Sequence, residues 1–476
     1  MKDYQVGYIK LALPKGRFLS PTASLLGEID LGFEGYSNEA KQYRLCSARF
    51  PNLSAKILQE KDIPIQVAVG NYDLGICGLD WIEEFLVKYP AGALVKISGL
   101  NYGEGGIHVV ASAQAGIANL DELSARRSDY RIVTEYPNLA EAFALNLRMR
   151  KFRIFPVWGA AAAYPPENAD LAVLWGKSGA HIAKQGLIPL KKLLPVTAFL
   201  IANRESLESK DLSQILMCFD SQLSAEPQTS IENELDSSKE LKVPRRSWPA
   251  KEVNLALPDG HQQAPAAQFL KQAGLALYGY SEEGVSRRPS ADLDWLGIKV
   301  IRPQDMPVQV ANGNFDLAIT GEDWLREHLY RFPSSPVKKL FALGFGTVKI
   351  VAAVSQGMPV NNIDELRALV QSSEFAPLKV ASEYINIADK YLRDNHINPY
   401  KLIPTWGASE AFLPEDADML IDNVQTGKTL KQHQLKIIDV LFQSSACLIA
   451  NKDSLSSSNK KEKMKFLTQK LRAGLL

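Results

Sequence analysis

The sequence predicts an α/β protein made of two tandem copies of one unit, each unit folding into two lobes. Two observations support this prediction: blocks of sequence recur in the same order in both halves, and within each half short apolar runs alternate with helix-length stretches. Such alternation is typical of mostly parallel sheets covered by helices on both faces. A unit of about 220 residues is large for one such sheet, which favours two lobes with a cleft between them.

The duplication is visible in several blocks that return in order. L-A-L-P-K-G-R (11–17) returns as L-A-L-P-D-G-H (255–261), D-I-P-I-Q-V-A-V-G-N-Y-D-L-G-I-C-G-L-D-W (62–81) as D-M-P-V-Q-V-A-N-G-N-F-D-L-A-I-T-G-E-D-W (305–324), T-E-Y-P-N-L-A (134–140) as S-E-Y-I-N-I-A (382–388), and F-L-I-A-N (199–203) as C-L-I-A-N (447–451). A repeat of this length is a duplicated domain rather than a solenoid.

The repeats set the expected boundaries. We expect a first unit at 1–224 (lobe I about 1–104 and 196–224, lobe II about 105–195), a linker at 225–251, and a second unit at 252–476 (lobe I about 252–346 and 444–476, lobe II about 347–443). The linker is polar and contains three prolines, which is typical of exposed connecting chain. A longer loop near 371–377 accounts for the extra residues of the second copy.

The apolar patterns of the first copy predict its individual elements. We expect strands at 7–13, 93–100, 107–113, 130–134 and 171–175, and helices at 20–28, at 57–59 with its flanks, at 81–87 and at 139–149. Each copy ends in an amphipathic segment, 212–223 or 460–471, that we expect to be a helix packed on lobe I.

Composition excludes several classes of protein. Lys and Arg number 54 against 53 Asp and Glu, so no overall field favours nucleic acid or an anionic membrane. The four cysteines and six histidines are scattered without metal-ligand spacing, which favours a reducing compartment and disfavours a zinc site or a disulfide framework. No signal-like segment and no run of 18 apolar residues occurs, so we expect a cytoplasmic protein.

One stretch, A-D-M-L-I-D-N-V-Q-T-G-K-T-L at 417–430, has the pattern of a phosphate-binding loop. An apolar run leads to Asp422, and Thr426, Gly427, Lys428 and Thr429 follow before a polar, helix-like segment. Amide groups of a glycine turn bind anions, hydroxyls add donors, and an upstream carboxylate binds sugar hydroxyls. The spacing is not that of a P-loop, and T-G-K-T also occurs in ordinary turns.

Both copies resemble the catalytic region of the ATP phosphoribosyltransferase family, over nearly the whole chain except the linker. The motifs that carry the resemblance are L-A-L-P-K-G-R (11–17), D-I-P-x-x-V-x-x-G-x-x-D-L-G-I-x-G-x-D (62–80), R-I-V-T-E-Y-P-N (131–138), L-G-F-G (343–346) and A-D-x-x-x-D-x-V-x-T-G-x-T-L (417–430). The resemblance implies a two-lobed fold like that of type II periplasmic binding proteins. It also implies condensation of ATP with phosphoribosyl pyrophosphate (PRPP) to N1-(5-phosphoribosyl)-ATP, the first step of histidine biosynthesis.

The resemblance also assigns candidate site residues. The candidate catalytic residues are Asp422, Glu410, Lys15 and Arg17; the PRPP loop comprises Asp422, Asn423, Val424, Gln425, Thr426, Gly427, Lys428 and Thr429; and the ATP or pyrophosphate set comprises Lys15, Arg17, Arg302, Thr320 and Gly321. Mg²⁺ is the expected cofactor, held mainly through substrate oxygens, so no protein metal ligand is assigned. The resemblance also implies a candidate partner, a regulatory subunit resembling histidyl-tRNA synthetase, because short family members use one; the duplication either replaces that subunit or leaves it necessary.

The two copies differ at these positions. Leu174 stands where the second copy has Asp422, Trp175 faces Asn423, Ser178 faces Thr426, His181 faces Thr429, and Ala162 faces Glu410. Conversely, Asp259 and His261 replace Lys15 and Arg17, whereas Gln59 and Cys77 face Arg302 and Thr320. These complementary losses predict an intrachain pseudo-dimer with one working site that draws on both copies, and further assembly into a homo-oligomer remains open.

Other readings stay open at this stage. The chain is alternatively a catalytically inactive paralogue that senses nucleotides or histidine, or a small-molecule binding protein of the periplasmic type. The three candidate cations are alternatively ordinary surface charges. We interpret other residues repeated in both copies as structural: turn and cap residues (Gly70, Gly313, Asp73, Asp316), helix N-terminal charges (Glu135, Glu383) and packing residues (Trp158, Trp406).

Overall fold

The computed structural model describes residues 7–31, 33–37, 43–117, 119–125, 129–219, 251–282, 284–372 and 377–475. The predicted linker, apart from Lys251, and most of the longer loop near 371–377 lie outside these ranges. In the described ranges, no helix is both long enough and apolar enough to span a membrane.

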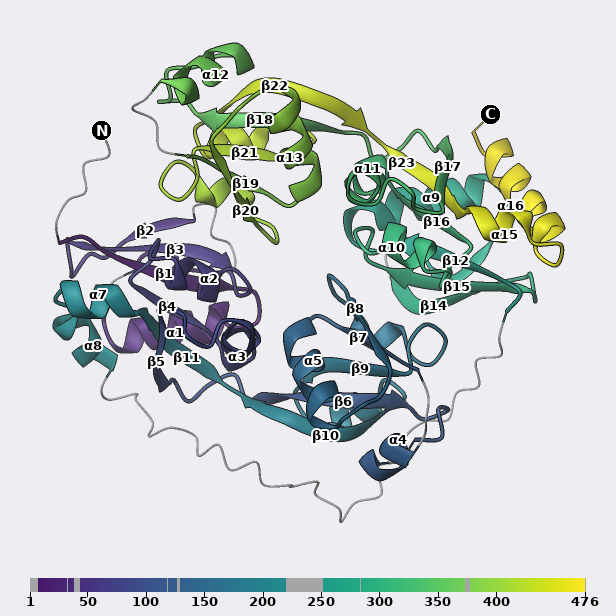
Figure 1. The fold of residues 1–476 in the computed structure, drawn as a ribbon, viewed down its shortest axis with the longest axis horizontal. Helices are drawn as coiled ribbons and strands as arrows, with labels where there is room; N and C mark the ends of the chain where they lie inside the picture. The colour runs from purple at the N-terminus through teal and green to yellow at the C-terminus, as the bar shows by residue number, and fades with distance from the viewer. Residues whose placement is uncertain are drawn as a thin grey trace. The chain divides into compact units, whose positions relative to one another are not determined.

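The described chain divides into two compact units, and each contains a short segment of the other sequence repeat. Unit 1 consists of Met1–Pro156, Ala169–Arg246 and Thr405–Ala411, and unit 2 consists of Val157–Asn168, Ser247–Pro404 and Phe412–Leu476. Each unit has two lobes, and each lobe is built around its own sheet (Figure 1).

Lobe I of unit 1 is a six-stranded sheet in the order β2-β3-β1-β4-β11-β5. Its strands are β1 (Ile9–Lys15), β2 (Arg44–Cys46), β3 (Leu53–Gln59), β4 (Leu74–Gly78), β5 (Leu94–Gly99) and β11 (Ala198–Asn203), and its helices are α1 (Leu19–Glu28), α2 (Ile63–Ala68), α3 (Leu79–Lys88), α7 (Arg204–Ser209) and α8 (Ser213–Phe219). β1 pairs in parallel with β3 and β4, while β11 runs antiparallel to β4 and β5. The sheet is therefore mixed.

Lobe II of unit 1 is a five-stranded sheet in the order β10-β6-β9-β7-β8. Its strands are β6 (Gly105–Ser112), β7 (Tyr130–Thr134), β8 (Phe152–Pro156), β9 (Leu171–Gly176) and β10 (Leu187–Val196), and its helices are α4 (Leu120–Ala125), α5 (Pro137–Asn146) and α6 (Gly179–Ala183). β7 is parallel to β8 and β9, whereas β6 is antiparallel to β9 and β10.

Unit 2 repeats this plan. Lobe I has the sheet β15-β12-β16-β23-β17 and a hairpin β13-β14, and lobe II has the sheet β20-β19-β21-β18-β22. The lobe I elements are β12 (Val253–Pro258), η3 (Gly260–Gln262), α9 (Gln263–Gln272), β13 (Leu277–Tyr280), β14 (Val285–Ala291), β15 (Leu296–Ile301), α10 (Met306–Ala311), β16 (Leu317–Gly321), α11 (Glu322–Arg331), β17 (Val337–Ala342), β23 (Ala446–Asn451), α15 (Lys452–Ser456) and α16 (Lys461–Ala473).

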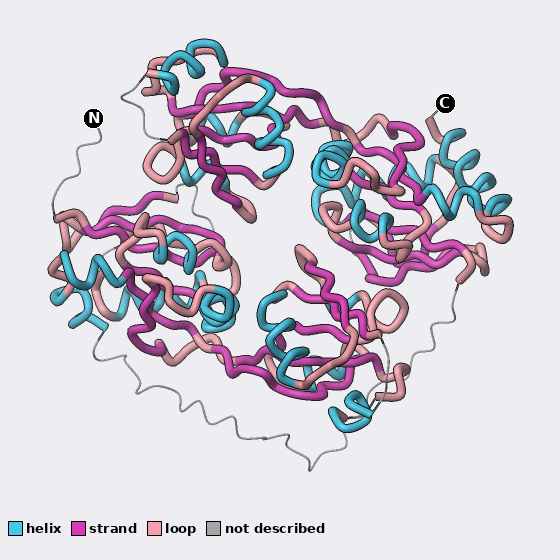
Figure 2. The backbone as a smooth tube through the Cα atoms, viewed as in Figure 1, coloured by secondary structure: helices cyan, strands magenta, loops and turns pink. Residues whose placement is uncertain are grey.

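The lobe II elements of the second repeat are β18 (Val348–Ser355), α12 (Ile363–Gln371), β19 (Leu378–Ser382), α13 (Ile385–Asp394), β20 (Tyr400–Pro404), η4 (Ser409–Phe412), β21 (Met419–Val424), α14 (Lys428–Gln432) and β22 (Leu435–Ser444). Figure 2 shows the helices packed against the strands of each sheet. Strand for strand the two units have the same central order, which confirms the α/β fold class and the predicted duplication.

In each unit the chain crosses twice between the lobes. In unit 1 it passes from β5 to β6 and returns from β10 to β11, which then inserts between β4 and β5. Because β11 arrives from the opposite direction, it pairs antiparallel with both neighbours. The returning strand explains why sheets expected to be mostly parallel are mixed.

The predicted helix at 57–59 with its flanks is wrong, because Leu53–Gln59 is β3. A short apolar run does not distinguish a buried strand from a helix by its periodicity. Here the long-range pairing decides: β3 lies parallel to β1 from Leu53 to Gln59, and four consecutive residues, Ala55 to Leu58, are buried. The other predicted helices and strands are present, with ends displaced by a few residues.

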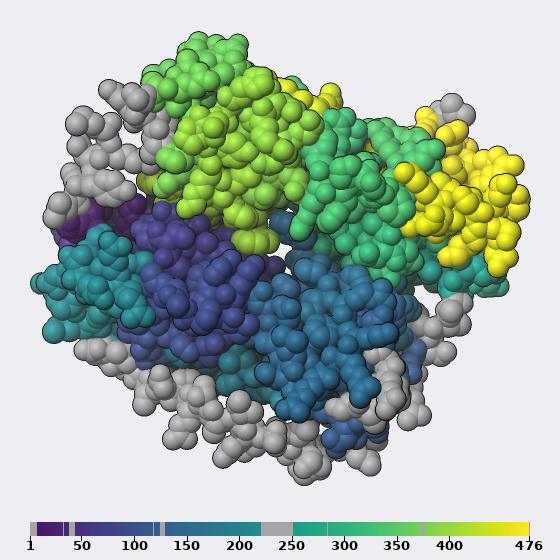
Figure 3. Space-filling model, viewed as in Figure 1, coloured from purple at the N-terminus to yellow at the C-terminus, as the bar shows by residue number. Residues whose placement is uncertain are grey.

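The C-terminal segments of both repeats pack on lobe I, as predicted. Leu212, Ile215 and Phe219 belong to the unit 1 core, and Met464, Leu467 and Leu471 of α16 belong to the lobe I core of unit 2. In Figure 3 the yellow surface of α15 and α16 covers one side of that lobe. Residues 220–223 of the first segment lie outside the described ranges.

The two units differ in how their cores connect. Among the described residues of unit 1, buried apolar side chains of both lobes form one continuous cluster that includes Leu11, Leu74, Val109 and Ile132. In unit 2 they form two separate clusters, one within lobe I and one within lobe II that also includes Trp324 of the lobe I helix α11. The lobes of unit 1 are thus packed on each other through apolar side chains to a greater extent than those of unit 2.

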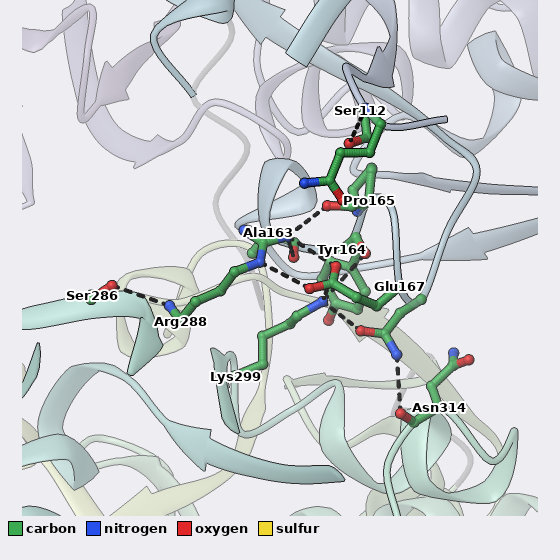
Figure 4. A network of polar contacts seen from close by, with 11 residues as sticks. Ser112, Ala163, Tyr164, Pro165, Glu167, Ser286, Arg288, Lys299 and Asn314 are labelled. Carbon is green, nitrogen blue, oxygen red and sulfur yellow. Dashed lines mark hydrogen bonds and ion pairs between the residues drawn. The ribbon is translucent and has the colours of Figure 1, made fainter. Parts of the chain in front are cut away.

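The segment Val157–Asn168 of the first repeat is held in unit 2 by one buried and one partly buried cation. Lys299, which is 5% exposed, bonds Glu167 at 3.0 Å and the Asn168 side chain at 2.6 Å, and Arg288 forms two hydrogen bonds with Glu167 (Figure 4). A buried cation without such partners would be strongly unfavourable. This polar network therefore fixes the segment in unit 2.

Candidate functional site

The predicted PRPP loop begins in the last three residues of β21 and continues to the start of α14. Ile421 pairs with Ser382 of β19 in parallel register, so the end of β21 and the end of β19 lie at the same edge of the lobe II sheet. The Ser382 hydroxyl donates to the Ile421 carbonyl at 2.6 Å and accepts the Tyr384 amide at 2.9 Å. Asp422, Asn423 and Tyr384 are thereby brought together at the carboxyl edge, where α/β sheets commonly bind ligands.

The loop itself turns at Gly427. This residue has a φ of 71°, in the left-handed region that favours glycine, and a Cβ built on it meets nothing within 4 Å. The amide of Lys428 lies 3.5 Å from the Thr426 hydroxyl, which is a long contact, and α14 begins at Lys428. The local geometry is the glycine turn that the sequence predicted, with Gln425, Thr426 and Lys428 exposed or partly exposed beside it.

Asp422 is oriented by Asn423. The Asn423 backbone amide donates to Asp422 Oδ1 at 2.7 Å, and its side-chain Nδ2 donates to the same oxygen at 3.2 Å and to the Tyr384 hydroxyl at 3.1 Å. Tyr384 in turn donates to Asp323 Oδ2 at 2.7 Å. A continuous set of hydrogen bonds therefore connects Asp422 of lobe II with α11 of lobe I.

Asp323 is buried and contacts hydroxyl groups. Ser444 donates to its Oδ1 at 3.0 Å, and the Asp323 amide donates back to the Ser444 oxygen at 3.0 Å. Burial, together with the negative charges of Asp323 and Asp422, raises the pKa of Tyr384 well above its usual value. The Tyr384 hydroxyl thus keeps its proton at neutral pH and remains a donor to Asp323.

The equivalent edge of unit 1 has a different composition. Tyr136 donates to Asp80 at 2.7 Å, as its counterpart Tyr384 does to Asp323, but Trp175 occupies the position of Asn423 and Leu174 that of Asp422. The Trp175 indole Nε1 is buried with no hydrogen-bond partner in the described part of the chain. Its ring lies 5.1 Å from the Arg17 guanidinium, within cation–π range.

Arg17 is already paired with two carboxylates. Its Nη2 lies 2.9 Å from Glu60 and 2.6 Å from Asp80, and its guanidinium lies over the Phe18 ring at 4.6 Å. Burial alone favours the neutral guanidine, but Asp80 and Glu60 outweigh it and raise the pKa of Arg17. Burial likewise raises the pKa of Glu60 to about 7, although Arg17 opposes this shift.

The other predicted cations have different surroundings. Lys15 donates to the Tyr43 hydroxyl at 2.9 Å. Arg302 lies 3.4 Å from Asp259, which also pairs with Arg287 at 2.7 Å, so the acidic residue at the Lys15 position of the second copy is balanced by two arginines. Arg302 is the more available to a ligand, because its side chain is 43% exposed, against 27% for Arg17.

Thr320 and Gly321 lie at the end of β16 and the start of α11. The Thr320 hydroxyl is fully buried and donates to the Pro303 carbonyl at 2.8 Å, so its donor is already used. A Cβ on Gly321 would stand 2.0 Å from Asp323 Oδ1, and one on Gly78 of the first copy 2.2 Å from Asp80 Oδ1. Both glycines are required so that the aspartate can fold back over the helix start.

The structure separates some predicted residues between the units. Asp422 to Thr429, Arg302, Thr320 and Gly321 belong to unit 2, whereas Lys15, Arg17 and Glu410 belong to unit 1. Within the described ranges, no group of three or more His, Cys, Asp or Glu is placed to hold a metal ion. Sequence reasoning missed Asp323, Ser444 and the role of Tyr384, although the repeated G-x-D-W and E-Y blocks contained a signal for two of them.

The fold and this edge define a duplicated two-lobed α/β protein with a carboxylate and a glycine turn at the end of a lobe II strand. The family model described as HisG, ATP phosphoribosyltransferase, matches residues 59–221 and 302–473, in both repeats. This chain therefore belongs to the ATP phosphoribosyltransferase family.

Individual relatives match about half of the chain. An ATP phosphoribosyltransferase of Saccharolobus solfataricus is 36% identical over 206 residues, which are 42% of this chain and 65% of that protein. One from Thermodesulfovibrio yellowstonii is 29% identical over 229 residues, 48% of this chain and 73% of that protein. The chain thus spans somewhat under two thirds of the first relative's length.

Solved structures give weaker matches. The ATP phosphoribosyl transferase (HisG:HisZ) complex from Thermotoga maritima matches with a TM-score of 0.38 and 22% identity, over 47% of this chain and 98% of that one. The alkanesulfonate-binding protein SsuA from Xanthomonas axonopodis matches with a TM-score of 0.31 and 13% identity, over 45% of this chain and 73% of that one.

Proposed function

We propose that this chain is an active ATP phosphoribosyltransferase that condenses ATP with PRPP to N1-(5-phosphoribosyl)-ATP and pyrophosphate in histidine biosynthesis. The observation that carries the proposal is the edge of unit 2, where Asp422 is oriented by Asn423 and followed by the Gly427 turn. Unit 1 has an apolar and an indole side chain at the same two positions. Family membership in both repeats supports the same activity.

The residues have distinct roles in this reaction. The Asp422 carboxylate accepts hydrogen bonds from the ribose hydroxyls, while amides around Gly427 and the hydroxyls of Thr426 and Thr429 bind the 5′-phosphate. The bond from adenine N1 to ribose C1 forms as the bond from C1 to pyrophosphate oxygen breaks, and its electron pair leaves with pyrophosphate. Alignment of the two substrates and stabilisation of the leaving group supply the catalysis.

Lys15 and Arg302 are the cations that we assign to the pyrophosphate or triphosphate. Lys15 contacts the Tyr43 hydroxyl rather than a carboxylate, and Arg302 is partly exposed. Arg17 must exchange Glu60 or Asp80 for a ligand phosphate before it contributes, which is why we rank it third. We also propose that Lys15 of the first copy and Glu410 contribute to the same site as Asp422.

Mg²⁺ is the cofactor that we propose. The described residues provide separate carboxylates, such as Asp422, rather than a cage, and this donor set suits an ion that enters bound to substrate phosphates. The ion would neutralise charge on the pyrophosphate. We expect PRPP affinity, measured by calorimetry, to fall when Mg²⁺ is chelated and to return when it is added back.

The test of the activity is product formation by the purified chain. Given ATP, PRPP and Mg²⁺, it should release pyrophosphate and form phosphoribosyl-ATP identified by mass spectrometry. The alternative, an inactive sensor of nucleotides or histidine, predicts binding without product. If product forms only after a histidyl-tRNA-synthetase-like subunit is added, the expected partner is required; activity of the chain alone would remove that requirement.

Lys15 tests whether the first copy contributes to the site. Lys15→Ala should lower kcat/KM about tenfold to a hundredfold, because a charge-assisted hydrogen bond to phosphate contributes about 1.5–3 kcal/mol. Lys184→Ala, which removes an exposed lysine of the same copy, is the control and should leave kcat/KM unchanged. Full activity of Lys15→Ala would show that the second copy is self-sufficient.

A further inference from the structure

A chain of hydrogen bonds connects Asp422 to the buried Asp323 through Asn423 and Tyr384. The roles assigned to the substrate-binding residues do not account for this chain. Asp323 on α11 accepts from Tyr384, Tyr384 accepts from the Asn423 amide, and the same Asn423 nitrogen donates to Asp422. Tyr384 is 1% exposed, so its hydroxyl does not reach a ligand. Any effect of Tyr384 on the reaction must therefore act through its hydrogen bond with the Asn423 side chain.

The Tyr384 ring is itself fixed in place. It stacks on Trp324 with centroids 4.4 Å apart, and its amide is held by the Ser382 hydroxyl at 2.9 Å. The acceptor Asp323 is held by Ser444 on its other oxygen. Because both ring and acceptor are immobile, the tyrosine oxygen presents its lone pair to Asn423 in one position.

The first copy contains the same tyrosine without the rest of the path. Tyr136 stacks on Trp81 at 4.4 Å and donates to Asp80 at 2.7 Å, so its packing and its bond to the aspartate match those of Tyr384. No amide follows, because Trp175 replaces Asn423. The bond between tyrosine and aspartate is therefore a feature of the fold, and its continuation to Asp422 belongs to the second copy alone.

We infer that Tyr384 is a positioning residue for PRPP: through the Asn423 amide it fixes the orientation of the Asp422 carboxylate that receives the ribose hydroxyls. Without the tyrosine oxygen, the Asn423 amide loses one of its two acceptors and rotates away from Asp422 Oδ1. The Asn423 backbone amide still donates to Asp422 Oδ1, but the carboxylate has lost its side-chain donor and is held less firmly, so PRPP binding must restrict it further. This inference rests on the proposed function.

The experiment compares Tyr384→Phe with Tyr136→Phe in the full chain. Both variants keep the stacked ring and remove one hydroxyl bonded to a buried aspartate, so both should lose similar stability. Tyr384→Phe should weaken PRPP binding, measured by calorimetry, about five- to tenfold and raise KM for PRPP by a similar factor, with KM for ATP within twofold. Tyr136→Phe should leave PRPP affinity unchanged.

A double-mutant cycle tests the route through the amide. If Tyr384 acts through Asn423, adding Tyr384→Phe to Asn423→Ala should weaken PRPP binding by less than twofold more. Fully additive losses, or equal PRPP affinities for wild type and Tyr384→Phe, would overturn the inference while leaving the proposed function in place. A wild-type chain that binds no PRPP would reject both, and equal losses in the Tyr384 and Tyr136 variants would reduce the effect to general destabilisation.

Discussion

At the carboxyl edge of each lobe II sheet, a tyrosine donates a hydrogen bond to an equivalent aspartate on a lobe I helix. The surroundings of that aspartate differ between the two units. In unit 1 Asp80 is neutralised by Arg17, and the Trp175 indole covers the guanidinium. In unit 2 Asp323 is held by Ser444 and Tyr384, and the path continues to an accessible carboxylate at Asp422. In unit 1 the charges at this edge are paired with each other, whereas in unit 2 the edge ends at the partly exposed carboxylate that we propose binds PRPP.

Several substitutions accompany this difference. Where unit 1 has Arg17 and Val196, unit 2 has His261 and Ser444, so each aspartate keeps a partner. A Cβ at Gly105 would stand 2.6 Å from the Trp175 indole nitrogen, and the second copy, which has no tryptophan there, has Val348 at the equivalent position. The first copy has thus been repacked around its tryptophan, in agreement with the single apolar core that joins its lobes.

Asp422→Leu, which gives the second copy the residue of the first, should have the largest effect. Loss of at least two hydrogen bonds to a charged group, each of about 1.5–3 kcal/mol, should lower kcat/KM for PRPP about a hundredfold or more. Leu174→Ala at the equivalent position should cost about 2–3 kcal/mol of stability but leave kcat/KM within twofold. Steady-state kinetics on the folded variants measures both effects. Wild-type kcat/KM in Asp422→Leu would exclude a role of Asp422 in binding the ribose hydroxyls.

Arg17→Met should have the next largest effect, on stability. It leaves Glu60 and Asp80 buried without their cation, which should lower the free energy of unfolding by about 3–5 kcal/mol at pH 8. His261→Met, the matched change at an exposed position of the second copy, should stay within about 0.5 kcal/mol. Equal stabilities of the two variants in denaturant titrations would show that the Arg17 cluster is not structural.

Glu60→Gln should have a smaller effect that depends on pH. Because burial raises the pKa of Glu60 to about 7, folded Glu60 keeps a proton that the unfolded chain has lost above its ordinary pKa of 4.5. The contribution of Glu60 to the free energy of unfolding is therefore full below pH 4.5. It is lost as the pH rises through 7, by up to roughly 3 kcal/mol. The second copy has Pro303 at this position.

The measurement is the change in unfolding free energy between pH 4.5 and pH 8. Glu60→Gln should show a smaller decline than wild type over this window. The remaining decline is assigned to other buried carboxyls such as Glu84, whose pKa burial also raises to about 7. An unchanged decline would show that Glu60 titrates in the folded chain as it does in the unfolded one.

Part of the candidate site was predictable from sequence because its pattern is local. Asp422, the glycine turn and the start of the following helix lie within eight residues, and local backbone preferences set their geometry. Asp323, Tyr384 and Ser444 were not predicted as one group, since Tyr384 is 61 positions from Asp323 and Ser444 is 121. Only the crossing of the chain between lobes brings them together.

The sequence by itself determined the duplication, the general alternation of strands and helices, and the absence of an Asp422 counterpart from one copy, because these depend on local pattern and on comparison of two repeats. The tertiary structure decided what each charge does. Lys15 and Arg17 are two residues apart, yet one contacts a hydroxyl and the other two buried carboxylates. The electrostatic state of a side chain depends on burial and on partners far along the chain, and neither is encoded in neighbouring residues.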